Sequence, residues 1–72
     1  MARPMTPALK AGTVIKALRQ ERGLTQRQLA ERARISLEAV WTIENGRKHP
    51  RRSTIELLAE ALGVDRGELA RA

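Results

Sequence analysis

The side chains best suited to directional polar contacts lie in the middle of the chain. If a helix begins after Ser36, a spacing of 100° per residue places Glu38 and Thr42 on the face opposite the apolar Val40. Residues 47–52 then carry four cations, Arg47, Lys48, Arg51 and Arg52. A carboxylate can accept a hydrogen bond from cytosine, a threonine side chain can pack on a thymine methyl group, and cations bind phosphate. These residue types at this spacing indicate contact with a nucleic acid.

Three neighbouring residues extend this pattern. Leu37, in the first turn of the expected helix, can pack on a thymine methyl group, and Asn45 falls on the outward face. Trp41 is the only aromatic residue and lies toward the flank of that face. We favour a partly buried ring that covers the junction with the following loop. The alternatives are that the ring stacks on a DNA sugar or supports a neighbouring phosphate contact, or that it contacts another protein.

Residues that catalyse reactions or bind metals are scarce. The chain contains no Cys, no Tyr, one His (His49) and one Asp (Asp65). We find no nucleophile–base pair or carboxylate pair with supporting features, and a single His makes a metal site unexpected. We expect neither an enzyme nor a protein that binds a metal or cofactor.

The net charge of +6 is unevenly distributed along the chain. Residues 1–52 hold 12 of the 14 cations and four of the eight acidic side chains, so they carry +8 while residues 53–72 carry −2. Such asymmetry is typical of a protein with one side that faces a polyanion. A solvated basic surface explains the charge alone equally well, and the polar pattern around Glu38 favours the first interpretation.

The length and composition indicate one small cytoplasmic domain. Among the 72 residues, we expect 7–70 to form a single domain and 1–6 a flexible N-terminal arm. The absence of cysteine fits a reducing compartment. No apolar segment approaches the roughly 20 residues of a membrane span, and the N-terminus lacks a signal-peptide core. We expect no membrane partner.

Capping residues and glycines predict helices in the first half of the chain. Thr6, followed by proline, resembles the N-cap of a helix that ends at Gly23, although Gly12 within it also allows a start nearer Ala11. A second helix over 26–33 is predicted by the capping-box pair Thr25 and Gln28. Ser36 then caps a third helix, which ends near Gly46.

Two further helices are predicted in the second half, so the expected fold class is all-α with five helices. Ser53 and Glu56 have capping-box spacing for a helix that ends at Gly63. Asp65 and Glu68 repeat the pattern for a short helix that ends at Leu69. Helical spacing predicts inward positions for Ala11, Val14, Ile15, Leu18, Leu29, Ala30, Ala33, Ala39, Val40, Ile43, Ile55, Leu58, Ala59 and Leu62.

One known family shares most of this pattern. The chain resembles the Cro/phage-repressor helix-turn-helix family, often labelled XRE, over residues 11–69, in the sequence IKALRQERGLTQRQLAERARIS…V…IENGR…P…T…LAEALGV. The resemblance implies a compact five-helix, lambda-repressor-like DNA-binding domain, with the helix-turn-helix in its second and third helices. It also implies a transcriptional regulator that binds a palindromic DNA operator as a homodimer, with the third helix in the major groove.

The resemblance assigns roles to individual residues. The family's base-reading positions match Leu37, Glu38 and Thr42. Its phosphate-binding positions match Gln26, Arg27, Asn45, Arg47, Lys48, Arg51 and Arg52. Arg19 and Glu44 match an ion pair that ties the first helix to the third. We expect this pair to be structural, with a net contribution reduced by desolvation.

The sequence departs from the family at two places. Arg34 occupies a turn position that often carries Gly. A left-handed backbone there would cost about 1 kcal/mol, so we expect a slightly different turn. Leu37 and Glu38 replace the paired glutamines of some phage repressors. The operators of those repressors therefore do not transfer to this chain.

The expected partners are DNA and a second copy of the chain. We expect Val64, Leu69 and apolar surface on the last two helices to form a two-fold contact that places the reading helices about 34 Å apart. An alternative is an antitoxin or a restriction–modification controller protein that binds its own promoter, a partner toxin, or both. A further alternative is a nonspecific DNA binder, which would need no varied reading face.

Overall fold

Five α-helices make up the part of the chain that the computed structural model describes, the backbone of residues 7–70 and the side chains of residues 10–69. They are α1 (Pro7–Glu21), α2 (Gln26–Ala33), α3 (Leu37–Glu44), α4 (Arg52–Leu62) and α5 (Arg66–Ala70). The predicted all-α class and five-helix order are confirmed. The predicted arm, residues 1–6, and the predicted cap at Thr6 lie outside the described residues.

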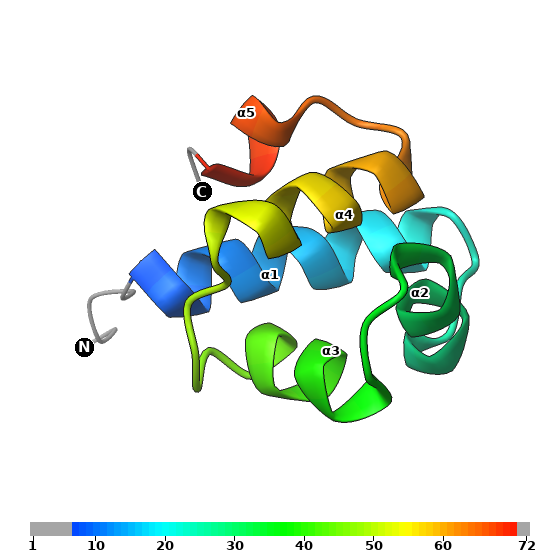
Figure 1. Cartoon of the computed structure of the whole chain (residues 1–72), viewed down its shortest axis with the longest axis horizontal. Helices are drawn as coiled ribbons and strands as arrows, with labels where there is room; N and C mark the ends of the chain where they lie inside the picture. The colour runs from blue at the N-terminus through cyan, green and yellow to red at the C-terminus, as the bar shows by residue number, and fades with distance from the viewer. Residues whose placement is uncertain (1–6, 71–72) are drawn as a thin grey trace.

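The two longest helices occupy the centre of the molecule (Figure 1). In this view α1 and α4 lie between α3 at one edge and α5 at the opposite edge, and α2 closes one end. α3 packs against α1 and α2, whereas α5 packs against α4 and α1. One long side of α3 therefore faces outward.

Each helix contributes one large, fully buried side chain to a single core. None of the five is more than 1% exposed: Ile15, Leu29, Val40, Leu58 and Leu69. The positions predicted to face inward lie in this core or, for Val14, Leu18 and Ala39, are half-buried at its edge. The core therefore holds the inward side of α3 and leaves the other side free.

The burial of Leu69 corrects the predicted dimer contact. Its side chain is 1% exposed and packs in the core of its own chain, so it has no surface to offer a second copy. α5 packs against α4 and α1, and this packing covers its leucine. Val64, the other predicted contact, is half-buried at the edge of the same core.

Gly12 brings α1 and α3 into backbone contact. It is buried, and a Cβ built at this position would overlap the carbonyl oxygen of Ile43 and lie 2.9 Å from that of Glu44. α1 continues through this glycine and begins at Pro7, the earlier of the two predicted starts. The end of α3 therefore rests directly on α1.

The turn after α2 contains a left-handed residue that is not glycine. Arg34 has φ 59° and ψ 40°, and its N–H donates to the Glu31 carbonyl at 3.3 Å. The Ile35 N–H donates to the Ala30 carbonyl at 3.0 Å, which is the pairing of a Schellman turn. The expectation of a different turn is therefore wrong. The chain keeps the left-handed turn with an arginine, at a cost of about 1 kcal/mol.

The predicted capping box at the start of α4 is also wrong. α4 begins at Arg52, and its N-cap residue, Arg51, makes no side-chain cap hydrogen bond. Ser53 already lies within the first turn, where its hydroxyl cannot act as a cap, because an N-cap needs extended backbone. Glu56 instead accepts a hydrogen bond from Arg66 at 2.7 Å.

Candidate nucleic-acid interface

Side-chain caps fix the starts of α2 and α3. Thr25 Oγ1 accepts from the Gln28 backbone N–H at 3.0 Å, and Gln28 Oε1 accepts from the Thr25 N–H at 2.9 Å, so this predicted capping box is confirmed. Ser36 Oγ accepts from the Ala39 N–H at 3.0 Å, as expected for the third helix. The side chains in the first turn of each helix therefore hold defined positions.

α3 divides its side chains between the core and the solvent. Leu37 is 39% exposed and Glu38 is exposed, whereas Val40 is buried. Thr42 is half-buried, and its hydroxyl donates to the Glu38 backbone carbonyl at 2.8 Å. Because that proton is used inside the helix, Thr42 offers an acceptor oxygen and a methyl group to a ligand. The structure thus brings the three predicted reading residues to one outward surface.

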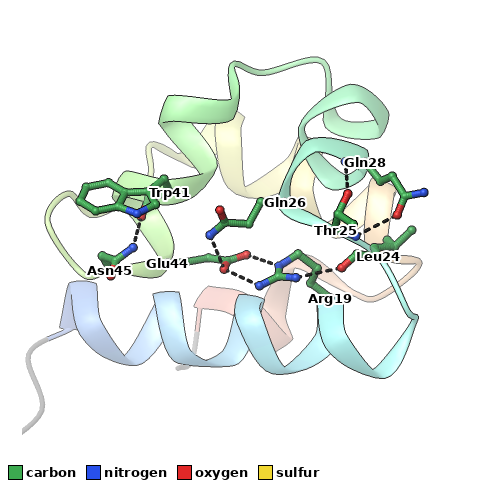
Figure 2. A network of polar contacts seen from close by, with 8 residues as sticks. All are labelled: Arg19, Leu24, Thr25, Gln26, Gln28, Trp41, Glu44 and Asn45. Carbon is green, nitrogen blue, oxygen red and sulfur yellow. Dashed lines mark hydrogen bonds and ion pairs between the residues drawn. The ribbon is translucent and has the colours of Figure 1, made fainter.

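Trp41 and Asn45 lie beside this surface, toward the loop after α3 (Figure 2). Trp41 is 45% exposed, so its ring is partly buried. The Arg47 guanidinium carbon lies 5.5 Å from the centre of the ring, which is within the range of a cation–π interaction. Asn45 Nδ2 donates to the Trp41 carbonyl at 2.8 Å. These contacts hold the first cation of the loop against the end of α3.

A groove of about 460 Å³ separates α3 from the start of α4. Glu38 and Thr42 line it from α3, while Lys48 and Arg51 line it from the loop. Both cationic side chains are exposed, as are those of Arg47 and Arg52. The predicted reading residues therefore adjoin a basic rim.

A buried ion pair ties α1 to the end of α3 (Figure 2). Arg19 Nε and Nη2 donate to Glu44 Oε2 and Oε1 at 2.7 and 2.9 Å, and Arg19 Nη1 donates to the Leu24 carbonyl at 2.8 Å. The hydrogen bond to Glu44 raises the pKa of Arg19 above its usual value, although burial alone would lower it. The predicted pair is present, and it connects two helices of the core.

Gln26, the first residue of α2, reaches the same ion pair. Its Nε2 donates to Glu44 Oε1 at 3.1 Å, a contact that no spacing in the sequence indicates. Glu44 and Thr42 are two positions apart and therefore lie about 200° apart around α3. Gln26 thus flanks one side of the outward surface and the basic groove flanks the other, while Arg27 is exposed beside Gln26 on α2.

Two other kinds of site are absent from the described part of the chain. Among these residues, no group of three His, Asp or Glu side chains lies close enough to hold a metal ion. None of the described helices is both long and apolar enough to cross a membrane.

Comparisons with known proteins assign this architecture to a family. A family model for a helix-turn-helix domain matches residues 11–72. The chain belongs to the helix-turn-helix family. The immunity repressor protein of Bacillus phage phi105 is 48% identical over 56 residues, which cover 78% of this chain and 39% of that repressor. The resemblance seen in the sequence is confirmed.

Two further helix-turn-helix proteins match over most of their length. An HTH-type transcriptional regulator of Sinorhizobium fredii, y4dJ, is 40% identical over 58 residues, covering 81% of this chain and 75% of that protein. The crystal structure of the restriction-modification controller protein C.AhdI from Aeromonas hydrophila superposes with a TM-score of 0.83 and 31% identity, covering 86% of this chain and 94% of that one. The chain spans only about two fifths of the phage repressor, with 39% covered.

Proposed function

We propose that this helix-turn-helix chain is a sequence-specific, double-stranded DNA-binding transcriptional regulator. It binds a palindromic operator as a homodimer, with α3 in the major groove. The observation that carries this proposal is the outward surface of α3, where varied polar and apolar side chains lie between two flanks able to bind phosphate. The repressor and regulator names of its relatives support it.

Three residues of α3 read the bases in this proposal. Glu38, an acceptor, suits the exocyclic amine of cytosine. Leu37 suits a thymine methyl group, and Thr42 contributes its methyl group or its acceptor oxygen, because its proton is bonded within the helix. Each such contact contributes roughly 1–3 kcal/mol of discrimination between base pairs.

The flanking residues bind the phosphates and fix the register of α3. Gln26, Arg27 and Asn45 contact the backbone near α2 and the end of α3, and the loop contributes Arg47, Lys48, Arg51 and Arg52. The loop cations are exposed and therefore able to approach a backbone without displacing protein contacts of the core. Trp41, half-exposed beneath Arg47, contacts the sugar or phosphate at the flank. Such contacts supply affinity that is independent of sequence.

The homodimer contact involves Val64 and apolar surface on α4. Leu57, on α4, is 37% exposed and so offers apolar surface beside Arg32, Arg34 and Glu60. The proposed two-fold contact has to hold the two copies of α3 about 34 Å apart, which is one turn of DNA. The net charge of −2 in residues 53–72 keeps this side away from the polyanion.

Selection of bound fragments from a random duplex library at about 150 mM salt tests the proposal. We expect an enriched inverted repeat whose half-site centres are about one helical turn apart. A selection without protein controls for amplification bias. An enriched single half-site would contradict the homodimer, and binding without any enriched sequence would contradict base reading and favour an antitoxin or a nonspecific binder.

Among DNA-binding transcriptional regulators, we favour a controller protein that binds its own promoter. The similarity to the restriction-modification controller C.AhdI, which extends over 94% of that chain, supports this subtype. Binding of the protein to the DNA upstream of its own gene, measured by footprinting, tests it. A footprint that lies only at other promoters would reject self-control and leave the DNA-binding proposal intact.

A further inference from the structure

Side chains from three helices form one connected chain of hydrogen bonds (Figure 2). Gln26 at the start of α2 donates to Glu44 at the end of α3, and Glu44 accepts two bonds from Arg19 of α1. Arg19 also donates to the carbonyl of Leu24, two residues before Gln26. Gln26, which is predicted to bind a DNA phosphate, is therefore connected to the buried ion pair of Arg19 and Glu44.

The Glu44 carboxylate determines which way the Gln26 amide faces. An ionised carboxylate can only accept hydrogen bonds, so the amide must turn its NH2 group toward it. Nε2 carries two hydrogens, and Glu44 takes one of them at 3.1 Å. The second has no partner among the described residues, and Gln26 is only half-buried. That N–H can donate to an anion at the start of α2, where free backbone N–H groups also favour negative charge.

Arg19 neutralises the carboxylate of Glu44, so that a phosphate can approach Gln26. A lone carboxylate close to a phosphate would repel it. Arg19 offsets the charge of Glu44 through two bonds of 2.7 and 2.9 Å, and the Glu44 side chain is only 2% exposed. Glu44 therefore orients the amide while the pair as a whole presents no net charge to the DNA.

We infer that Glu44 and Arg19 are positioning residues for DNA binding, which orient the Gln26 side chain so that its second Nε2–H donates to a DNA phosphate. This role goes beyond a structural tie between α1 and α3. It rests on the proposed function, because it requires Gln26 to meet a phosphate.

A double-mutant cycle between Gln26 and Glu44 tests the role. Affinity is measured by fluorescence anisotropy with a random-sequence duplex of about 20 base pairs at low salt, since a phosphate contact does not depend on sequence. Gln26→Ala should weaken binding about three- to tenfold, the loss of one hydrogen bond. Glu44→Gln should weaken binding about threefold in the parent but should not weaken Gln26→Ala any further.

Charge alone predicts the opposite sign for Glu44→Gln, because removing a negative charge favours DNA binding. Glu31→Gln is the matched control, since it neutralises an exposed carboxylate on α2 and should act equally in both backgrounds. Equal effects of Glu44→Gln in both backgrounds, or tighter binding in both, would overturn the inference. Failure of the parent to bind any duplex would instead overturn the proposed function.

Side-chain amide NMR of the parent protein tests the inference without any variant that could unfold. Each of the two Gln26 Nε2 hydrogens gives its own resonance. Addition of the duplex should shift the hydrogen that is not bonded to Glu44 more than the one that is. Equal shifts of the two, or no shift during binding, would overturn the inference. Circular dichroism melting defines the temperature at which all the variants of the cycle are folded.

Discussion

The α3 side and the α4–α5 side of the molecule use their charges differently. Beside α3, the cations of the loop and the carboxylate of Glu38 are exposed, whereas Glu44 is buried against Arg19. On the other side, Glu56 and Arg66 form a 2.7 Å ion pair whose side chains are 52% and 50% exposed. Such an exposed pair stabilises a protein by about 0–1 kcal/mol at most. Positive charge is therefore left available where DNA would bind and is partly neutralised elsewhere.

The two sides should consequently respond differently to substitution. Changes on the outward surface of α3 and its loop should alter DNA binding while the fold persists. Changes in the packing of α5 should alter the stability of the whole domain, since one core joins all five helices. Three predictions test this division and a fourth tests the turn after α2, in order of decreasing expected effect.

Leu69→Glu should have the largest effect, on stability. It removes a fully buried side chain from the core and buries a carboxylate, so the free energy of unfolding should fall by roughly 4 kcal/mol. Thermal melting followed by circular dichroism measures this loss. Val64→Glu is the control at a half-buried site, and it should fold and shift the mass measured in solution toward the monomer. A folded, monomeric Leu69→Glu protein would reinstate Leu69 as a dimer contact.

Glu38→Ala and Thr42→Ala should alter sequence preference without altering stability. Each should relax the preference at one base pair per half-site, at a cost of about 1–3 kcal/mol in affinity for the selected operator. Repeating the library selection with each variant measures the change. If both variants retained the preference of the parent, the outward surface of α3 would not be the reading surface.

Arg51→Ala should weaken binding to all duplexes by a similar factor. It should also lower the slope of log affinity against log salt by about 1, because one phosphate contact is lost. Arg66→Ala removes the same charge from the α4–α5 side and serves as the matched control. We expect little change for that control, because Arg66 is paired with Glu56 away from α3. Equal slopes for both variants would erase the distinction between the two sides.

Arg34→Gly should have the smallest effect and should stabilise the protein by about 1 kcal/mol. Gly63 ends α4 with φ 70° and ψ 32° and the same hydrogen-bond pattern, which shows that the turn needs no side chain. Denaturant unfolding measures the difference in free energy. A loss of stability would mean that the contacts of the arginine side chain stabilise the protein by more than the strain of its backbone destabilises it.

The sequence correctly predicted where α2 and α3 begin, because a side-chain cap precedes each helix and each is long enough to show an apolar face. Thr25 and Ser36 stand directly before their helices, and both cap bonds are present. Ser53 and Glu56 have the same spacing but lie inside α4, because the chain already becomes helical at Arg52. Residue spacing alone cannot separate these two situations.

Contacts between distant elements lay beyond the sequence patterns. α5 has only five residues, too few to define an apolar face, so the burial of Leu69 follows from its packing on α4 and α1. The outward positions of Glu38 and Thr42 followed from helical spacing, because α3 has two full turns, and the reading role predicted for them and for Leu37 also relied on the family resemblance. The bond from Gln26 to Glu44 depends on how α2 meets the end of α3, which no local spacing encodes.

The glycine contact between α1 and α3 has a mechanical consequence. With the carbonyl oxygens of Ile43 and Glu44 resting against the Gly12 backbone, α3 cannot tilt toward α1 to fit an imperfect groove. If α3 enters a major groove as proposed, this direction of adjustment is closed to the protein, and a bend or twist of the DNA has to supply it. In the proposed operator complex, base pairs that no side chain touches would then influence affinity through their flexibility, and the stiffness of the spacer between the proposed half-sites would become part of the recognised sequence.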